Sequence, residues 1–409
     1  MEKLLLFIPI ENIGLEKYVQ TLSFFAILSI FISPILLILY KIKKSSIFNI
    51  FLILIGWLVC STGFNIIFRL NFQENLLRAL SGLIFGFFVF ILLREIFCKS
   101  NERNLFRGLY YSFIIVLIFF IYDLFFQFHK TFRIFACYTE PSHLGTDLSL
   151  IYIPMFILYS KYMSRIKKVF IFLLLLTIVL LTFSGTAYIK VLFFLILYLI
   201  FGIKKIKEFV IYSFFIALIV SVSILIFFNL YTNNYFLSMM RWTINSIEKG
   251  YEFLPVSITD RMSFWIFLLN IKNITVPIDT FLKFIIGGGV GNDLLFLKFL
   301  PTTVASQIIC VKAFGSYITS FWGRIFSYGG IIGFILYFIF IFSIYKKIKL
   351  TSFTSKEKAV LFSWLITLIL ASSFDLAPFQ TVALWLLPAY VDGINLKSKQ
   401  FLFQNDIKV

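Results

Sequence analysis

The stretch Ile47–Ile67, IFNIFLILIGWLVCSTGFNII, contains no charged side chain. An α-helix rises about 1.5 Å per residue, so a helix of this length reaches across the roughly 30 Å of hydrocarbon in a bilayer. The stretch therefore predicts a membrane-spanning helix. Similar apolar stretches recur from Tyr18 to Ile394, and they determine the fold class of the whole chain.

The composition agrees with this prediction, because the 409 residues are 60% hydrophobic and only 14% charged. In soluble domains about a quarter of the residues are charged. The alternation of polar and apolar residues that a lipid-facing β-barrel needs is absent from the sequence. We expect an all-α polytopic membrane protein, 1–409, forming a single integral membrane domain with about 11 transmembrane helices, in a range of about 10–12. The predicted spans are Tyr18–Tyr40, Ile47–Ile67, Leu76–Cys98, Leu105–Phe128, Leu144–Tyr162, Val169–Phe183, Ala187–Ile203, Phe209–Leu230, Tyr317–Tyr345, Ala359–Phe374 and Thr381–Ile394.

Lysine and arginine cluster in every second connection between these spans, and this bias sets orientation by the positive-inside rule. The clusters are Lys41–Lys44, Arg94–Arg107, Lys161–Lys168, Lys204–Lys207 and Lys346–Lys358. The pattern places the N-terminus outside and the C-terminus inside the cell. Nearly all of the formal charge of +18 then belongs to the inner side, so the charge reflects topology and does not indicate a nucleic-acid partner.

One connection is much longer than the others, the outer-face loop 231–316. Its apolar content stays high, so parts of it are expected to lie against the membrane surface as short amphipathic helices. Thr259-Asp260 is a candidate N-cap, and the residues that follow at helical spacing on one face are Met262, Trp265, Ile266 and Leu269. This helix places Arg261 in its first turn, near the outer mouth of the membrane domain.

A compact polar cluster, Glu140-Pro141-Ser142-His143, falls at the outer edge of a predicted span. A carboxylate, a hydroxyl and an imidazole are costly beside hydrocarbon, so their combination favours a functional site over a solvated turn. Asp123 lies near the outer end of the preceding span. For this residue two readings stay open, a structural contact or a place in a polar cavity, and the structural reading is favoured.

The outer loop ends in the glycine-rich segment IGGGVGN, Ile286–Asn292. Dense glycine lets backbone N–H groups approach an anion closely, so Gly287, Gly289 and Gly291 are candidate phosphate-binding positions. The alternative reading is a flexible connection. The lysine of a P-loop is missing, and no βαβ unit surrounds the glycines.

No motif with the spacing of a metal site is present, and nothing in the sequence calls for a cofactor. If the protein transfers a group from a phosphorylated donor, arginine and lysine would have to meet the charge of the leaving group. The arginines predicted on the outer face are Arg69, Arg78, Arg133, Arg241, Arg261 and Arg324. The alternative for each is an arginine that reaches the lipid headgroups or caps a helix.

Three segments together resemble the bacterial O-antigen and capsule polymerases of the Wzy type, and more distantly the O-antigen ligases. The first is RIFACYTEPSHLG, from Arg133 to Gly145. The second runs from Arg261-x-x-x-Trp265 to Gly291, and the third is SYITSFWGRIFSYGGIIG, Ser316–Gly333. The ligases have a histidine just before the third segment, where this chain has Phe314-Gly315-Ser316, so the polymerases are the better match.

The resemblance implies an enzyme of the bacterial inner membrane that works on its periplasmic face without a metal. Such polymerases transfer the growing glycan from undecaprenyl pyrophosphate to the non-reducing end of a new lipid-linked repeat unit. The implied partners are the undecaprenyl-pyrophosphate-linked oligosaccharide, membrane lipid and a chain-length regulator. The O-antigen ligase reading, and a lipid-linked oligosaccharide flippase or other transporter, are the alternatives.

The residues can be matched to the steps of this reaction. Arg261 and Arg241, with Arg324, are candidates for clamping the pyrophosphate. Glu140 or His143 would act as the general base that takes the proton from the acceptor hydroxyl. Arg133 could instead form a salt bridge with Glu140, in which case the basic role passes to His143. The further substrate-binding candidates are Trp265, Gly287, Gly289 and Gly291.

Overall fold

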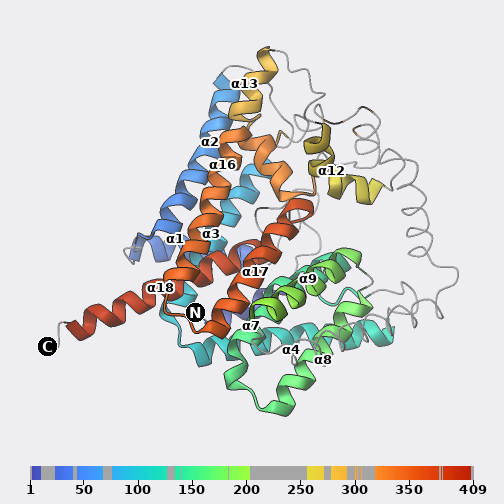
Figure 1. Cartoon of the computed structure of the whole chain (residues 1–409), viewed down its shortest axis with the longest axis vertical. Helices are drawn as coiled ribbons and strands as arrows, with labels where there is room; N and C mark the ends of the chain where they lie inside the picture. Colours follow the sequence, from blue (N-terminus) through green and yellow to red (C-terminus); the bar gives the residue numbers. More distant parts are fainter. Residues whose placement is uncertain are drawn as a thin grey trace.

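The described part of the chain is helical in all of its regular elements (Figure 1). The computed structural model describes residues 2–10, 24–39, 44–67, 76–126, 134–138, 140–182, 184–202, 256–270, 278–292, 300, 302, 305, 318–376, 379 and 381–406. The β-type pairing within these ranges is one isolated bridge between Ser320 and Leu376. The all-α prediction is confirmed for these residues.

The helices and helical turns have the following bounds. They are η1 (Glu2–Phe7), α1 (Phe24–Leu39), α2 (Ser46–Ile67), α3 (Leu76–Lys99), α4 (Glu102–Phe126), α6 (Pro141–Asp147), η2 (Leu148–Tyr152), α7 (Ile153–Leu158), η3 (Tyr159–Tyr162), α8 (Arg165–Leu181), α9 (Gly185–Gly202), α12 (Val256–Asn270), α13 (Ile278–Ile286), α16 (Phe321–Leu350), α17 (Ser355–Phe374) and α18 (Val382–Asp406).

Six helices in the described ranges are long and apolar enough to cross a membrane. They are α2, α3 from Ala79 onward, α4, α9, α16 and α17, and each coincides with a predicted span. The class of multi-pass α-helical membrane protein is therefore supported, while the count of eleven, the inner membrane and the orientation stay predictions. The predicted span Phe209–Leu230 and most of the loop 231–316 lie outside the described residues; α12 and α13 are the helices described within that loop.

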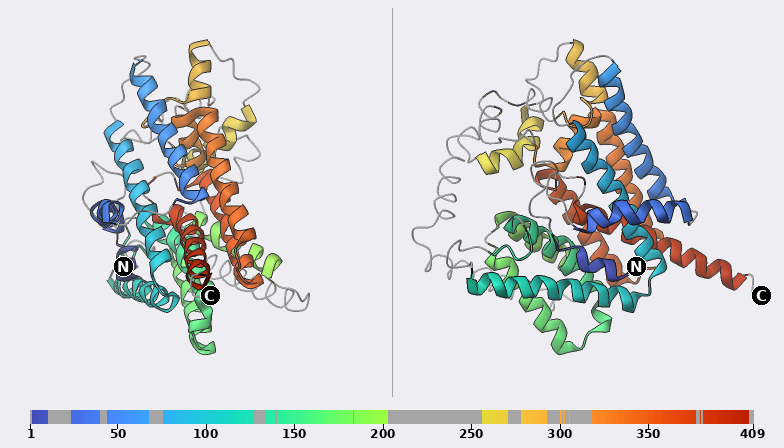
Figure 2. Two further views of the ribbon diagram at one scale, coloured as in Figure 1. Left: turned by 90° about the vertical axis from the view of Figure 1, so that its left-hand side faces the viewer. Right: turned by 180° about the vertical axis from the view of Figure 1, so that it is seen from behind.

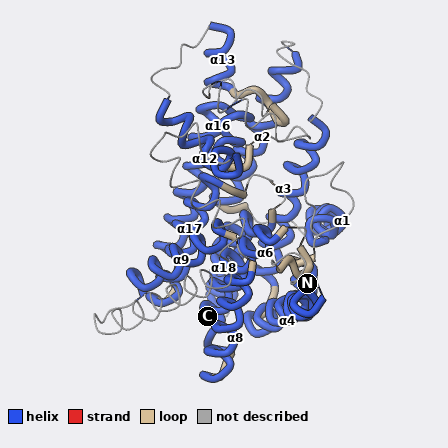
Figure 3. The backbone as a smooth tube through the Cα atoms, turned by 90° about the vertical axis from the view of Figure 1, so that its right-hand side faces the viewer, coloured by secondary structure: helices blue, strands red, loops and turns tan. Residues whose placement is uncertain are grey.

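Helices that are distant in sequence form the main packing contacts. α3 packs between α1 and α18, α2 packs on α16, and α17 packs on both α9 and α16. In Figures 1 and 2, α4 runs crosswise to α2 and α16, at the end of the molecule where α8 also lies. Figure 3 shows α6 in the interior between these groups of helices. This arrangement brings α6 and α9 close to the end of α17.

The predicted span Leu144–Tyr162 is not one regular helix. It begins as α6, widens into the π-helical turn η2, continues as α7 and closes as the 3₁₀ turn η3. The physical reason lies at Pro154, which has no backbone N–H and whose ring would crowd the carbonyl four residues earlier. The backbone therefore widens, and Ile153 N donates to Leu148 O.

The glycine-rich segment and α2 both contact α16 at a kink in that helix. Gly330 adopts a positive φ of 63°, which interrupts the helical hydrogen bonding of α16. Two side chains of α2 donate hydrogen bonds to backbone carbonyl groups at the kink. Trp57 Nε1 donates to Gly329 O at 2.8 Å, and Ser61 Oγ donates to Tyr328 O at 2.8 Å. Gly287 packs directly against this point, since a Cβ added there would lie 2.5 Å from Gly330 N.

We predict that Gly287→Ala destabilises the protein. Gly287 has a φ of 93°, which an L side chain rarely adopts, and the added methyl group would meet the backbone of α16. Strain of this kind costs about 1–3 kcal/mol, and the clash adds to it. The measurement is the midpoint of thermal unfolding of the purified protein in detergent.

Gly56→Ala is the matched control for this prediction. Gly56 lies within α2, and nothing approaches within 4 Å of a Cβ added there. Alanine is preferred over glycine inside a helix by about 1 kcal/mol, so the control should unfold at the same temperature as the native chain or slightly higher. Equal midpoints for the two variants would show that the contact between Gly287 and α16 is not tight.

Candidate functional site

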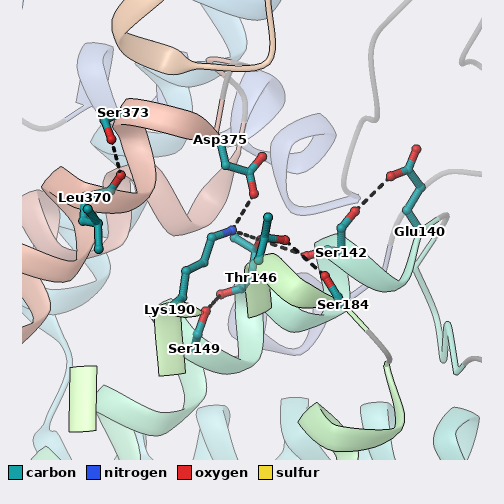
Figure 4. A network of polar contacts seen from close by, with 10 residues as sticks. Glu140, Ser142, Thr146, Ser149, Ser184, Lys190, Leu370, Ser373 and Asp375 are labelled. Atoms are coloured by element: carbon teal, nitrogen blue, oxygen red, sulfur yellow. Dashed lines mark hydrogen bonds and ion pairs between the residues drawn. The ribbon is translucent and has the colours of Figure 1, made fainter. Parts of the chain in front are cut away.

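The Glu140-Pro141-Ser142-His143 cluster begins α6. Glu140 occupies the N-cap position with extended backbone angles, and Pro141 follows at the first helical position, where its missing N–H costs nothing. The Glu140 side chain is exposed, and Ser142 Oγ donates to Glu140 Oε2 at 2.9 Å. His143 is partly buried, one position further along the helix. The start of α6 thus presents an exposed carboxylate beside a hydroxyl group, as Figure 4 shows.

Asp123 holds the backbone just before this cluster. Its Oδ2 accepts hydrogen bonds from Phe135 N at 2.9 Å and from Ala136 N at 2.6 Å. Ala136 has a positive φ of 51°, so the turn that Asp123 stabilises is a tight one. Asp123 is buried, which agrees with the favoured structural reading of this residue. Its contacts help to fix the approach of the chain to Glu140.

A buried lysine lies at the centre of the polar network in Figure 4. Lys190, on α9, has no solvent exposure, and its Nζ donates to Asp375 Oδ2 at 2.5 Å and to Thr146 Oγ1 at 2.7 Å. An ammonium group without a partner is very costly inside a protein or a membrane, so these two contacts are needed to retain it. Lys190 therefore joins α6, α9 and the end of α17.

Close packing of two helices places Thr146 within reach of Lys190. A Cβ added at Gly145 would collide with the side chain of Ala187, so α6 and α9 can approach this closely only with glycine at that position. Thr146 Oγ1 also donates to Ser142 O at 2.8 Å. Lys190 is thus linked through Thr146 to the backbone carbonyl of Ser142, whose hydroxyl group separately contacts Glu140.

Asp375 is fixed at the end of α17 by the segment that precedes α16. Its carbonyl accepts a hydrogen bond from Phe321 N at 3.0 Å, and the next residue, Leu376, has a positive φ of 66° and pairs with Ser320. Ser320 Oγ donates to Ser373 O at 2.7 Å. These contacts set the direction of the Asp375 side chain, which keeps 18% of its surface exposed.

Arg261 lies on α12, which packs against α17. Its side chain is half-buried, and no hydrogen bond to another described residue engages the guanidinium group. It interacts electrostatically with Asp375: burial raises the pKa of this carboxyl group, Lys190 and Arg261 lower it, and the result is a pKa below the ordinary value. Asp375 is therefore ionised at neutral pH, with two cationic side chains near it.

Trp265 lies one helical turn after Arg261, so the two side chains share a face of α12. Its indole Nε1 donates to Ser373 Oγ at 3.3 Å, and its ring centre lies 6.0 Å from that of Trp322. Trp322 Nε1 in turn donates to Ser372 Oγ at 2.8 Å. With 36% of its surface exposed, Trp265 presents an aromatic surface beside Arg261.

Arg324 is in a different environment from Arg261. It is only 4% exposed, and one of its terminal nitrogens donates to Ile318 O at 2.9 Å, closing the turn before α16. Next to this turn, Thr319 Oγ1 donates to Asp260 Oδ2. The contact with Ile318 favours a structural role for Arg324, which ties the preceding turn to α16. A pyrophosphate contact from this residue stays a prediction.

The glycine-rich segment directs most of its amides into the protein. Gly288 N donates to Ser327 O at 2.8 Å, Gly289 N to Tyr328 O at 3.1 Å, and Val290 N to Thr62 Oγ1 at 2.8 Å. The segment from Gly287 to Asn292 is buried. Its geometry favours a structural connection between α2, α13 and α16. Phosphate binding at Gly287, Gly289 and Gly291 stays a prediction without support from these contacts.

Two predicted binding residues, Arg133 and Arg241, lie outside the described residues. Conversely, Lys190 and Asp375 were not among the candidates taken from the sequence. The available signal was a lysine inside the apolar span Ala187–Ile203, since a charged residue inside a membrane helix suggests function by default. The partner of this lysine could not be read from the sequence, because Asp375 lies far along the chain.

A search against protein families finds no model that matches this chain, and no curated protein sequence is significantly similar to it.

Proposed function

We propose that the protein is a surface-polysaccharide polymerase that transfers a growing glycan from undecaprenyl pyrophosphate to a new lipid-linked repeat unit. The observation that carries the proposal is the chain of contacts from exposed Glu140 through Ser142, Thr146 and Lys190 to Asp375, next to Arg261. A candidate base and a candidate receptor for the leaving group thus both lie beside the polar side chains that join α6, α9 and α17. The resemblance of the three sequence segments supplies the substrate class.

The proposed reaction uses these groups in one displacement. The acceptor hydroxyl oxygen forms a bond to the anomeric carbon of the donor sugar, while the bond from that carbon to the pyrophosphate oxygen breaks. The pyrophosphate leaves with the electron pair, and the hydroxyl proton passes to the base. Cationic groups at the leaving oxygen stabilise the charge that develops there. Arg261 has this role in the proposal, with Arg241 and Arg133 as further candidates.

Glu140 is the favoured base, and His143 is the alternative. The Glu140 carboxylate is exposed. Its Oε2 accepts a hydrogen bond from Ser142, and in the proposal its Oε1 accepts the proton of the acceptor hydroxyl group. His143 is partly buried and has contacts within the protein. Trp265 beside Arg261 offers a flat apolar surface on which a sugar ring or the first isoprene units of the donor can pack.

A flippase for lipid-linked oligosaccharides is the second candidate, and one observation favours it. Transporters place charged residues within their spans, and here Arg94 Nε of α3 contacts Asp392 Oδ2 of α18 at 2.7 Å with both side chains fully buried. Ser45 Oγ, just before α2, also donates to Asp392 Oδ2 at 2.7 Å. The same contacts serve equally well to lock three helices together.

We predict that Arg261→Ala abolishes long glycan chains in cells while single repeat units remain linked to lipid. Loss of a charge that stabilises the leaving group lowers turnover by about 10²–10³. The measurement is the ladder of glycan lengths on a gel, combined with the leaflet location of the lipid-linked units. Arg165→Ala, which alters an exposed arginine at the start of α8, is the matched control.

A normal ladder in the Arg261→Ala variant would contradict the polymerase proposal. Accumulation of lipid-linked units in the inner leaflet would favour the flippase, because a polymerase acts only after its substrate has crossed the membrane. Accumulation in the outer leaflet is the result that the polymerase proposal requires.

We also predict that Glu140→Gln lowers turnover by about 10²–10⁴, the usual contribution of a general base. The amide keeps the size of the side chain and can still accept a hydrogen bond from Ser142, so membrane levels of the variant should match the native chain. His143→Ala, three residues further along the chain, should leave turnover unchanged. If His143→Ala is inactive and Glu140→Gln is active, the base is His143.

A further inference from the structure

Two cationic side chains, Lys190 and Arg261, interact with the carboxylate of Asp375, and they differ in how far a ligand could reach them. Lys190 is fully buried and contacts Asp375 directly at 2.5 Å. Arg261 is half-buried on α12, which packs on α17, and it lies one helical turn before Trp265, whose indole Nε1 donates to Ser373 Oγ, two residues from Asp375. These three groups together carry one positive charge. Which cation neutralises the carboxylate therefore decides which cation can attract an anion.

We propose that Lys190 neutralises Asp375 and so leaves the charge of Arg261 available to a pyrophosphate ester. This inference rests on the proposed function for the identity of the anion. Lys190 is a positioning residue in this scheme, because a side chain without solvent exposure does not touch a ligand. Arg261 makes the contact. Without the lysine, Asp375 would pair with Arg261 and compete with the incoming anion.

The other carboxylates near this group already have partners of their own. Asp147 accepts a hydrogen bond from Tyr138 OH at 3.1 Å, and its electrostatic effect on Lys190 is smaller than that of Asp375. Asp260 accepts from Thr319 Oγ1. Glu140 is exposed to solvent. Asp375 is the carboxylate that Lys190 contacts, and so the one whose charge depends most on that lysine.

Charge and hydrogen bonding at position 190 can be separated by substitution. A glutamine amide can still donate hydrogen bonds toward Thr146 and Asp375, but it removes the positive charge. Lys190→Gln should therefore weaken binding of farnesyl pyrophosphate to the full-length protein in detergent by about tenfold or more, since an uncompensated carboxylate then competes with the anion for Arg261. Lys168→Gln, at an exposed lysine of α8, is the matched control for the change in net charge and should bind as the native chain does.

The double variant Lys190→Gln/Asp375→Asn removes both charges and puts a side-chain amide, which can still form hydrogen bonds, at each position. The proposal expects its affinity for farnesyl pyrophosphate to return to within about threefold of the native value, because Arg261 again has no competing carboxylate. Native affinity in the Lys190→Gln single variant would overturn the proposal, because the pair would then act through hydrogen bonding alone. Equally weak binding in single and double variants would also overturn it.

A third variant keeps the test decisive if Lys190→Gln does not fold. Asp375→Asn alone leaves both cations and removes the carboxylate, so its affinity should equal or exceed that of the native chain. A clear loss of affinity in Asp375→Asn protein that unfolds at the native temperature would overturn the proposal. Binding is measured without any transfer reaction, so a protein that binds in this pattern yet forms no glycan chains would refute the proposed function and not this inference.

Discussion

The need to pair a buried ammonium group shapes the region where α6, α9 and α17 of this membrane protein meet. Lys190 lies inside an apolar helix, where an unpaired charge would cost several kcal/mol. Thr146 and Asp375 must therefore lie next to it, which places α6 and the end of α17 against α9. The approach requires glycine at position 145 and the tight turn at Leu376. A buried ion pair adds little net stability by itself, so its presence in this location suggests a function.

Part of this arrangement follows from the sequence and part does not. The helices α2, α9 and α17 lie close to their predicted spans, because long apolar stretches have few alternatives in a membrane. That Glu140 and Arg261 form one site stays a prediction from the sequence. The contacts around Lys190 involve residues 146, 190 and 375, and no local pattern reveals a pairing over such distances. The π-helical turn before Pro154 and the buried amides of the glycine-rich segment likewise depend on tertiary packing.

The two polar regions of the described structure differ in what they can do. The buried contact between Arg94 and Asp392 joins α3 to α18, and Ser45, just before α2, donates to the same carboxylate, so both charged side chains are closed off from solvent. The network around Lys190 instead leads to an exposed carboxylate at Glu140 and a half-buried guanidinium at Arg261. A site for chemistry needs groups that remain open to a substrate. This contrast is why we assign the reaction to the second region.

The most direct test of the central claim, that this network is a glycan-transfer site, is reconstitution of the purified full-length chain into lipid vesicles with purified lipid-linked repeat units. The account predicts that the native protein alone converts single units into a ladder of longer lipid-linked glycans, with one undecaprenyl pyrophosphate released for each unit added. Single units that remain unchanged in the presence of folded, correctly oriented protein would contradict it.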